Sequence, residues 1–236
     1  MDRIDKIIAS QGQYSRSEVK KLVKSGRVTL DGRVLKSSDE KADPNVNIIA
    51  IDGKAVNYKK HIYIMLNKPQ GVVSATDDRD HPTVIDLVPK ELRRDGLFPA
   101  GRLDADTVGF VLITDDGDFA HEILSPKNHI MKTYHAVLQR DLTQEDIASF
   151  KNGIELKDGT LCLEAEVTAL DSPQPMAQVK ICEGKYHQVK RMFAALGNKV
   201  LYLKRVKMGG LPLDDTLEEG QCREITAEEL ELIKQK

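Results

Sequence analysis

Among all segments of the sequence, residues 101–113 place the strongest constraint on the fold of this chain. A Gly-Arg-Leu-Asp turn ends at Asp104, and residues 108–113 follow it without a charged or polar side chain. A short apolar run beside a glycine turn indicates a buried strand. Asp104 would then be a carboxylate on a loop that a rigid strand holds in place, where binding and catalytic groups are commonly carried. Taken alone, an aspartate after such a turn is most often a solvated turn residue.

The composition is that of a folded chain with room for one large domain or two smaller ones. The 236 residues are 40% hydrophobic, which is enough for a core and argues against disorder. The sequence has no run of about 18 apolar residues and no apolar core near its N-terminus, so we expect neither a membrane span nor a signal peptide. Cys162, Cys182 and Cys222 are isolated, which predicts neither a disulfide framework nor a zinc site and favours the cytoplasm.

Charge is distributed unevenly, although the net charge is only −2. Residues 1–36 carry nine Lys/Arg against four Asp/Glu, and residues 184–208 carry seven Lys/Arg and no acid. Residues 209–236 carry eight acids against three bases. Two basic blocks can provide phosphate-binding faces whatever the total charge. Such blocks also occur on solvated helix faces, so by themselves they leave nucleic-acid binding open.

Hydrophobic periodicity and turn signals predict a mixed α+β fold. Ser15 with Glu18 forms a capping-box signature for one helix, and Thr143 with Asp146 caps another. Further helices are predicted over 2–11, 119–124, 186–196 and 227–234. Strands are predicted over 28–30, 34–35, 62–66, 108–113, 132–138, 160–170, 176–182 and 200–206. Since the order lacks strict βαβ alternation, we expect a mixed, mainly antiparallel sheet with flanking helices.

The pattern divides the chain into a small N-terminal α/β domain over residues 1–56, a polar linker over 57–61 and a larger domain over 62–236. Residues 74–84 are too polar and turn-rich for a helix or strand, so we expect a surface loop near the active cleft. Three acids in that loop do not have the spacing of a known metal-binding motif, and Pro82 interrupts them.

About the first 55 residues resemble the S4 RNA-binding domain. The resemblance is carried by Arg-Ile-Asp-Lys at 3–6, Ser-Arg-Ser at 15–17 and the Gly-Arg-Val-Thr-Leu-Asp-Gly run at 26–32. It implies that basic side chains here meet phosphates, which position a protein on RNA and carry little sequence information. The residues so implied are Arg3, Arg16, Lys20 and Arg27.

Three further segments resemble the RNA pseudouridine synthases. They are Gly-Arg-Leu-Asp at 101–104, Lys-Thr-Tyr at 132–134 and the run Glu-Gly-Lys-Tyr-His-Gln-Val-Lys-Arg-Met-Phe at 183–193. The resemblance implies the pseudouridine synthase fold, with Asp104 as the essential catalytic residue and Tyr134 stacking on the target base. It also implies that Arg102 helps to turn the target uridine out of the RNA. Without the resemblance, Tyr134 reads as a half-buried strand residue.

The same resemblance assigns the other site residues. Lys190 falls where most members carry an arginine paired with the catalytic aspartate, and it can supply the charge without the bidentate fork. Leu203 matches the apolar residue beneath the base and also suits a core position. Arg191 is then either an RNA contact or a residue that supports the site. The implied reaction is an isomerisation, so no cofactor and no metal are expected.

The segments at 65–71, 76–83 and 183–198 are most similar to the RsuA-type branch of the family. This likeness implies that the substrate is 16S ribosomal RNA or a small-subunit assembly particle, with uridine 516 as the target and a monomeric enzyme. An enzyme acting on 23S ribosomal RNA and a non-catalytic RNA-binding assembly factor remain alternatives. A glycosidase or nucleosidase would instead use Asp104 and Asp106 as paired carboxylates.

Overall fold

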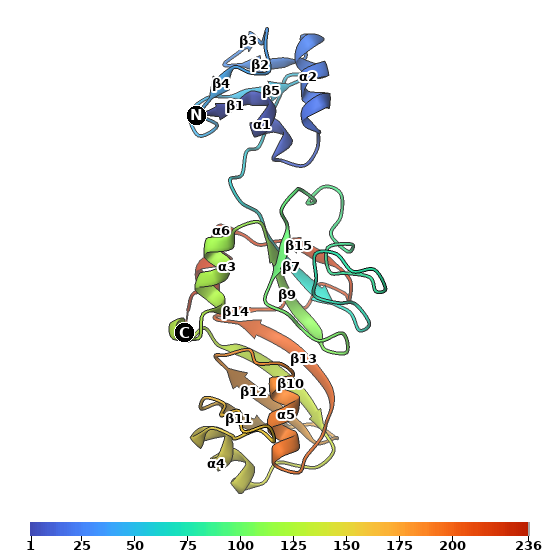
Figure 1. The fold of residues 1–236 in the computed structure, drawn as a ribbon, viewed down its shortest axis with the longest axis vertical. Coiled ribbons are helices and arrows are strands. Elements are labelled where there is room, and N and C mark those ends of the chain that lie inside the picture. Colours follow the sequence, from blue (N-terminus) through green and yellow to red (C-terminus); the bar gives the residue numbers. More distant parts are fainter. Residues whose placement is uncertain (236) are drawn as a thin grey trace. The chain divides into compact units, whose positions relative to one another are not determined.

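The computed structural model describes residues 1–235, and their contacts group them into two units. The first unit comprises Met1–Ile62 together with Val88–Leu97. The second comprises Tyr63–Leu87 and the chain from Phe98 onward. Figure 1 follows each unit along the sequence.

The first unit packs two helices with short strands. Helix α1 is Ile4–Ala9, and α2 is Arg16–Lys24, which begins with the expected capping box between Ser15 and Glu18. Strands β2 (Val28–Leu30), β3 (Arg33–Val34), β5 (Ile49–Ile51) and β6 (Lys54–Ala55) form a sheet in the order β3-β2-β5-β6. Strand β1 (Asp2–Arg3) pairs with β4 (Lys41–Ala42). Asp31 and Gly32 have φ of 49° and 81° and close the predicted β2–β3 hairpin.

Residues 88–97 are part of the first unit although they lie far from it in sequence. Arg94 is buried and donates from Nη1 to the carbonyl of Lys59 over 3.0 Å. Lys59, in the segment interpreted as a linker, donates its backbone N–H to Gln11 Oε1 over 2.9 Å. Gly12 has φ of 83°, and a Cβ there would meet the carbonyl oxygen of Arg93 at 2.1 Å. These residues therefore approach one another at the backbone level.

A nine-stranded sheet forms the second unit, with its main path in the order β11-β12-β10-β13-β9-β7-β15. Among the described strands of this sheet, only the pair β9–β13 is parallel, so the expectation of a mainly antiparallel sheet is confirmed. The strands are β7 (Tyr63–Lys68), β8 (Phe98–Ala100), β9 (Val108–Thr114), β10 (Lys132–Leu138), β11 (Glu166–Ala169), β12 (Met176–Ile181), β13 (Val200–Met208), β14 (Leu211–Pro212) and β15 (Cys222–Glu224).

Helices cover the two halves of this sheet separately (Figure 1). Helices α3 (Gly117–Leu124) and α6 (Ala227–Ile233) pack on the half formed by β7, β8 and β9, around a core that includes Met65, Phe110 and Phe119. Helices α4 (Gln144–Asn152) and α5 (Gln188–Ala195) accompany the other half, where the rings of Phe150 and Phe193 lie 5.0 Å apart. A short 3₁₀ helix, η1, spans Pro126–Asn128.

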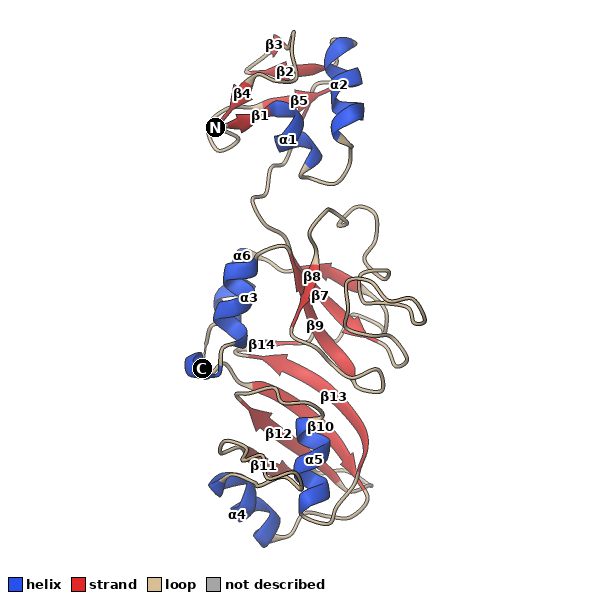
Figure 2. Cartoon of the chain, in the orientation of Figure 1, coloured by secondary structure: helices blue, strands red, loops and turns tan. Residues whose placement is uncertain are grey.

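Three predicted elements begin two or more residues later than expected. The helix predicted over 2–11 is only Ile4–Ala9, because Asp2 and Arg3 are extended in β1 and pair with β4. The strand predicted over 160–170 is only Glu166–Ala169, because residues 154–162 turn back on themselves through the bridge between Glu155 and Leu161. The helix predicted over 186–196 is Gln188–Ala195, since His187 has φ of 48° in the left-handed region. Residues 69–97, which include the predicted loop at 74–84, form no helix or strand (Figure 2). No helix within residues 1–235 is both long and apolar enough to cross a bilayer.

Candidate active site

The second unit contains a cavity of about 830 Å³ beside the loop that leads into β9. Asp104, Tyr134 and Arg102 line this cavity, and all three also line a smaller pocket of about 60 Å³ next to Leu203. Lys190, on α5, contacts the carboxylate of Asp104. The structure therefore brings Asp104, Tyr134, Lys190 and Leu203 together from four separate segments.

The loop that carries Asp104 is fixed by hydrogen bonds from a buried lysine. Lys68, at the end of β7, donates from its ammonium to the carbonyls of Pro69, Ala105 and Thr107 over 3.0, 3.2 and 2.8 Å. These acceptors use all three of its N–H donors. Burial lowers the pKa of Lys68 to about 8, although the carboxylates of Asp106 and Asp104 oppose that shift. Since two of these acceptors flank Asp106, Lys68 determines the course of this loop.

A close approach of two backbones places the loop against β13. Gly109, in β9, pairs with Arg205 of β13 in parallel register. Gly109 has φ of 97°, and a Cβ at this position would meet the carbonyl oxygen of Arg205 at 2.3 Å. Arg205 donates from Nε to the carbonyl of Phe110 over 2.7 Å, which adds a side-chain link between the same strands. A larger residue at 109 would separate β9 from β13 and move Asp104 away from Leu203.

One ammonium serves two carboxylates at the cavity edge. Lys190 Nζ lies 3.1 Å from Asp104 Oδ2 and 2.5 Å from Asp106 Oδ1. Burial acts to lower the pKa of Lys190, but its hydrogen bonds to Asp106 and Asp104 outweigh this effect and the pKa is raised. The hydrogen bond from Lys190 holds the pKa of Asp106 below its usual value. Lys190 is therefore charged at neutral pH and stabilises ionised carboxylates.

His187 also contacts Asp104, which the sequence reasoning missed. Its Nε2 lies 3.3 Å from Asp104 Oδ1, and its ring stacks on Tyr186 with centroids 3.9 Å apart. The left-handed backbone of His187 immediately precedes α5, which carries Lys190. The spacing of three residues between His187 and Lys190 at a helix start was the available signal, because residues three apart there share a face.

Tyr134 and Leu203 lie on one face of the sheet. In the β10–β13 pair Tyr134 is opposite Arg205 and Ala136 is opposite Leu203, and directly opposite residues project to the same side of a sheet. Because Tyr134 and Ala136 are two residues apart on one strand, Tyr134 and Leu203 also project to the same side. Both Tyr134 and Leu203 are buried. They provide an aromatic and an aliphatic wall beside Asp104, which suits a planar base.

Buried polar atoms near this wall have unused hydrogen-bonding capacity. Thr107 Oγ1 and Arg205 Nη2 are buried without a hydrogen-bond partner among the described residues. Thr107 lines the smaller pocket, and Arg205 lines the larger one. Lys132 lines the larger cavity too, where burial lowers its pKa to about 8 and the Arg205 cation contributes. Groups of this kind are expected to meet polar atoms of a bound molecule.

The two predicted RNA-contacting arginines of this unit differ in their surroundings. Arg102 is exposed and lines both pockets. Arg191 is held by the chain itself, with Nη2 2.5 Å from Asp158 Oδ2 and Nη1 donating to the carbonyl of Tyr186 over 3.2 Å. Arg102 is thus available to a ligand in the cavity, whereas Arg191 braces the segment that carries Tyr186.

In the first unit, the basic residues implied by the S4 resemblance also fall into two groups. Arg3 donates to Asp5 and Asp39, and Arg27 donates to both oxygens of Asp52 over 2.8 and 2.5 Å. Arg16 and Lys20 are exposed on α2, beside its buried residues Val19, Leu22 and Val23. Of these four residues, Arg16 and Lys20 are therefore the ones whose charge is available to phosphates.

Within residues 1–235 no group of three or more His, Cys, Asp or Glu side chains is arranged to hold a metal ion. In the loop at 74–84, the carboxylate of Asp78 binds its own loop. Asp78 accepts from the backbone N–H groups of Asp80 and His81, each over 3.0 Å.

Comparisons with known proteins give consistent results. Residues 62–195 match the family described as RNA pseudouridylate synthase, and residues 2–48 match the S4 domain. A Bacillus subtilis protein described as the uncharacterized RNA pseudouridine synthase YtzG is 46% identical over 235 residues, covering 99% of this chain and 98% of the relative. Ribosomal small subunit pseudouridine synthase A of Escherichia coli K12 is 40% identical over 229 residues, covering 97% and 98%.

The Yersinia pestis protein of the same description is 41% identical over 230 residues, covering 97% of this chain and 96% of the relative. Among solved structures, a crystal structure of a pseudouridylate synthase matches with a TM-score of 0.68 and 38% identity, covering 99% of this chain and 100% of the other. These matches confirm both resemblances that were inferred from the sequence.

Proposed function

This chain belongs to the RNA pseudouridylate synthase family and carries an S4 domain, and on that premise we propose that it converts a uridine of 16S ribosomal RNA to pseudouridine. Relatives named ribosomal small subunit pseudouridine synthase A, about 40% identical over nearly the full chain, support this substrate. The finer proposal is that the target is uridine 516 and that the reaction takes place in the cytoplasm, on free RNA or on a small-subunit assembly particle.

The observation that carries the proposal is the meeting of Asp104, Tyr134, Lys190 and Leu203 in one place. In this reaction the bond from N1 to C1′ of the ribose breaks, the uracil turns, and a bond from C5 to C1′ forms. C5 loses its hydrogen as a proton and N1 gains one, so the overall change is an isomerisation. Such a site needs an anionic group at the sugar, a surface that holds the free base and exclusion of water.

Asp104 is the group in this arrangement that can act at the ribose. As a nucleophile it attacks C1′, and as a base it removes a ribose proton; both roles require the ionised form. Lys190 donates a hydrogen bond from Nζ to Asp104 Oδ2 over 3.1 Å and so holds the carboxylate at the cavity. His187, at 3.3 Å on the other carboxylate oxygen, limits rotation of the carboxylate.

Two side chains hold the base and a third helps it to leave the RNA stack; they are Tyr134 and Leu203, and Arg102. The freed uracil stacks on Tyr134 and packs against Leu203, which retains it while it turns; stacking of this kind contributes about 1–3 kcal/mol per base. Taking uridine out of its stack costs a few kcal/mol. Arg102 is exposed at the cavity. From there its side chain fills the space that the uridine leaves in the RNA stack.

The glycosidase alternative finds no support in the electrostatics of the loop. A glycosidase needs one of its two carboxyl groups protonated as a general acid, and therefore a raised pKa. Here Asp104 and Asp106 share the ammonium of Lys190, and the pKa of Asp106 is lowered. A lowered pKa is the opposite of what a general acid at Asp106 would need.

The test of the proposed function is to map pseudouridines in ribosomal RNA from the source organism with and without this gene. We expect one pseudouridine in 16S RNA to disappear on deletion and to return with a plasmid copy. A loss in 23S RNA would support the large-subunit alternative. An unchanged map together with defective subunit assembly would support a non-catalytic assembly factor.

A further inference from the structure

A second hollow, of about 380 Å³, adjoins the candidate active cavity between α5 and the start of β13. Leu203 and His187 line it as well as the pocket that contains Asp104. Asp106 and Lys190 also belong to its wall. The hollow is therefore continuous with the place where the target uridine would react. We call it the β13 groove and define it by Lys199, Leu201, Tyr202, His187, Lys190 and Leu203.

A β-bulge gives the groove its apolar surface. In the β10–β13 pair Val137 is opposite Tyr202 and Leu138 is opposite Val200, which leaves Leu201 as an extra residue. A regular strand would bury one of two consecutive side chains, but here Leu201 is 59% exposed and Tyr202 is 39% exposed. Bulges of this kind redirect side chains, and they are frequent beside active sites. The bulge has turned two large apolar groups outward next to the buried Leu203.

The groove also has a cationic side. Lys190, Arg191 and Lys199 belong to its wall, against the single carboxylate of Asp106. Lys190 and Arg191 are engaged with aspartates, but the Lys199 ammonium is exposed and has no carboxylate partner within residues 1–235. An aromatic platform beside an available cation is the arrangement that holds a single-stranded nucleotide by its base and its phosphate.

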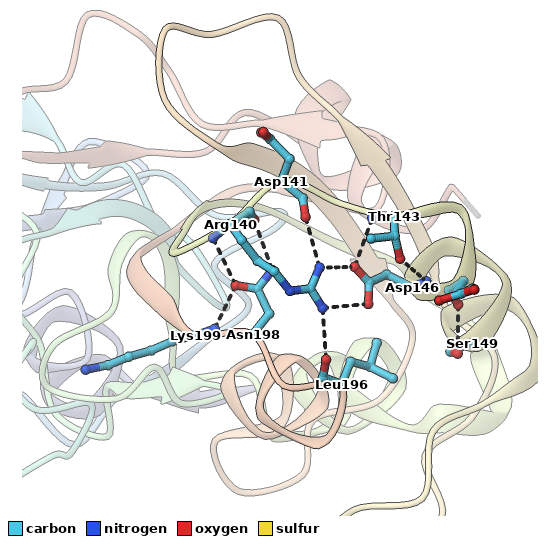
Figure 3. A network of polar contacts seen from close by, with 9 residues as sticks. Arg140, Asp141, Thr143, Asp146, Ser149, Leu196, Asn198 and Lys199 are labelled. Atoms are coloured by element: carbon cyan, nitrogen blue, oxygen red, sulfur yellow. Dashed lines mark hydrogen bonds and ion pairs between the residues drawn. The ribbon is translucent and has the colours of Figure 1, made fainter.

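A polar network fixes the turn on which Lys199 stands (Figure 3). The buried Asn198 donates from Nδ2 to the carbonyl of Arg140 over 3.0 Å and accepts the backbone N–H of Lys199 over 2.8 Å. The Arg140 guanidinium donates to the carbonyl of Leu196 over 2.9 Å and to Asp146 over 2.6 Å. Figure 3 shows the Lys199 side chain directed away from this network. The groove is thus preformed, which lowers the entropic cost of binding there.

We propose that the β13 groove binds a nucleotide of the same RNA strand, next to the target uridine, with its base on Tyr202 and Leu201 and its phosphate at Lys199. The proposal rests on the proposed function, because it takes the reacting uridine to lie at Asp104. RNA is favoured over a protein partner because the wall joins the reaction cavity directly and presents the Lys199 ammonium, whereas Lys190 and Arg191 are paired with aspartates. Residues 184–208, which include α5 and this part of β13, hold seven Lys/Arg and no acid.

The test measures binding of short single-stranded oligoribonucleotides, with a central uridine, to the full chain by fluorescence anisotropy over a salt series. Tyr202→Ala should raise the dissociation constant about 10-fold, whereas Tyr202→Phe should bind like the parent chain, because the aromatic face is kept. Lys199→Ala should lower the salt slope by about 0.7, the contribution of one phosphate contact on a single strand. Leu161→Ala is the matched control, since Leu161 is an exposed leucine like Leu201, with 67% exposure against 59%, and lies outside the groove.

Photo-cross-linking identifies the bound nucleotide. Oligonucleotides with 4-thiouridine at one position beside the central uridine should cross-link to the peptide that contains Leu201 and Tyr202, and that product should disappear with Tyr202→Ala. The proposal is overturned if Tyr202→Ala and Leu201→Ala both bind RNA as Leu161→Ala does. It is also overturned if these variants bind RNA normally but fail to bind small-subunit assembly particles, because the groove would then receive a protein.

The binding measurements do not depend on turnover, so the two proposals fail in different ways. If the oligonucleotides use the groove while ribosomal RNA from the deletion strain keeps all its pseudouridines, the proposed function is wrong. If the parent chain modifies 16S RNA and Tyr202→Ala leaves both affinity and rate unchanged, the proposal that the groove binds a nucleotide is wrong. Thermal unfolding of each variant should match the parent chain, because the truncated side chains are exposed.

Discussion

His187 Nε2 contacts Asp104 Oδ1 at 3.3 Å, on the carboxylate oxygen opposite the one that Lys190 approaches. The carboxylate is therefore held from two sides by residues of one short segment, His187 before α5 and Lys190 within it. A carboxylate with both oxygens engaged has one orientation toward a ribose in the cavity, and orientation is among the larger contributions to rate.

The first prediction concerns this positioning role. We expect His187→Ala to lower kcat about 10- to 100-fold with little change in KM, because the substrate still enters the cavity but Asp104 is free to rotate. His187→Gln keeps an N–H donor and should recover part of the loss. Single-turnover kinetics on a 16S RNA transcript measures the effect. Equal rates for His187→Ala and the parent chain would mean that Lys190 alone orients the carboxylate.

The second prediction concerns Asp104 itself. Asp104→Asn keeps the shape of the side chain and removes its charge, so we expect turnover to fall below detection while RNA binding persists. Release of tritium from RNA labelled at uracil C5 measures turnover, and filter binding measures affinity. Near-normal tritium release by this variant would contradict the mechanism.

Lys190 provides the third prediction. Lys190→Arg keeps the cation between Asp104 and Asp106 and should retain activity within about 10-fold, although the guanidinium has a different geometry. Lys190→Met leaves two neighbouring carboxylates without their shared cation and should lose more than about 100-fold. The same tritium assay compares the two variants. If the arginine and methionine variants have the same rate, the charge of Lys190 has no part in the reaction.

The fourth prediction is a pH dependence of stability from Lys68. Its pKa is about 8 in the folded chain, against an ordinary value of 10.5. Between pH 8 and about 10.5 the unfolded chain binds more protons at this residue than the folded chain, so Lys68 makes the free energy of unfolding increase with pH. Lys68→Met should be less stable at neutral pH and should lack this part of the increase. Urea denaturation at pH 7, 8 and 9.5 measures both effects, with Lys54→Met, an exposed lysine of β6, as the control. Parallel pH profiles for the parent chain and Lys68→Met would contradict the prediction.

The fifth prediction separates available cations from paired ones in the first unit. The double variant Arg16→Ala, Lys20→Ala should lower the slope of log K against log salt by about 1.4–1.8, the contribution of two phosphate contacts. Arg27→Ala should change this slope less, because Arg27 is bound to both oxygens of Asp52. Filter binding over a salt series measures all three proteins. A larger slope change for Arg27→Ala than for the double variant would show that the RNA lies elsewhere on this unit.

Sequence motifs predicted those helices and strands whose ends depend on neighbouring residues in the chain. The capping boxes at Ser15 and Thr143 locate the starts of α2 and α4, and the strand predicted over 132–138 has the bounds of β10. Strand β15, in contrast, was missed, because Cys222–Glu224 is extended only through pairing with Ile64–Leu66, far away in sequence. Three residues are too short a window for a period of two to be recognised.

In the candidate site, too, residues within motifs could be predicted, whereas features that depend on contacts between distant segments could not. Asp104, Tyr134, Lys190 and Leu203 were named from motifs, and the structure places them together. The role of Lys68 was not visible, since its three acceptors are backbone carbonyls that carry no sequence signature. The exposure of Leu201 and Tyr202 also depends on a bulge, which is a property of two paired strands rather than of one.

The division of the first unit into Met1–Ile62 and Val88–Leu97 restricts how this architecture can be inherited. The chain passes between the units three times, after Ile62, after Leu87 and after Leu97. A gene rearrangement that transferred only the coding region for residues 1–62 would leave the carbonyl of Lys59 without Arg94 and the backbone of Gly12 without its neighbour Arg93. The two coding regions are therefore expected to be exchanged together or not at all, so lineages of this enzyme should preserve the pairing of both segments rather than shuffle the N-terminal region as an independent cassette.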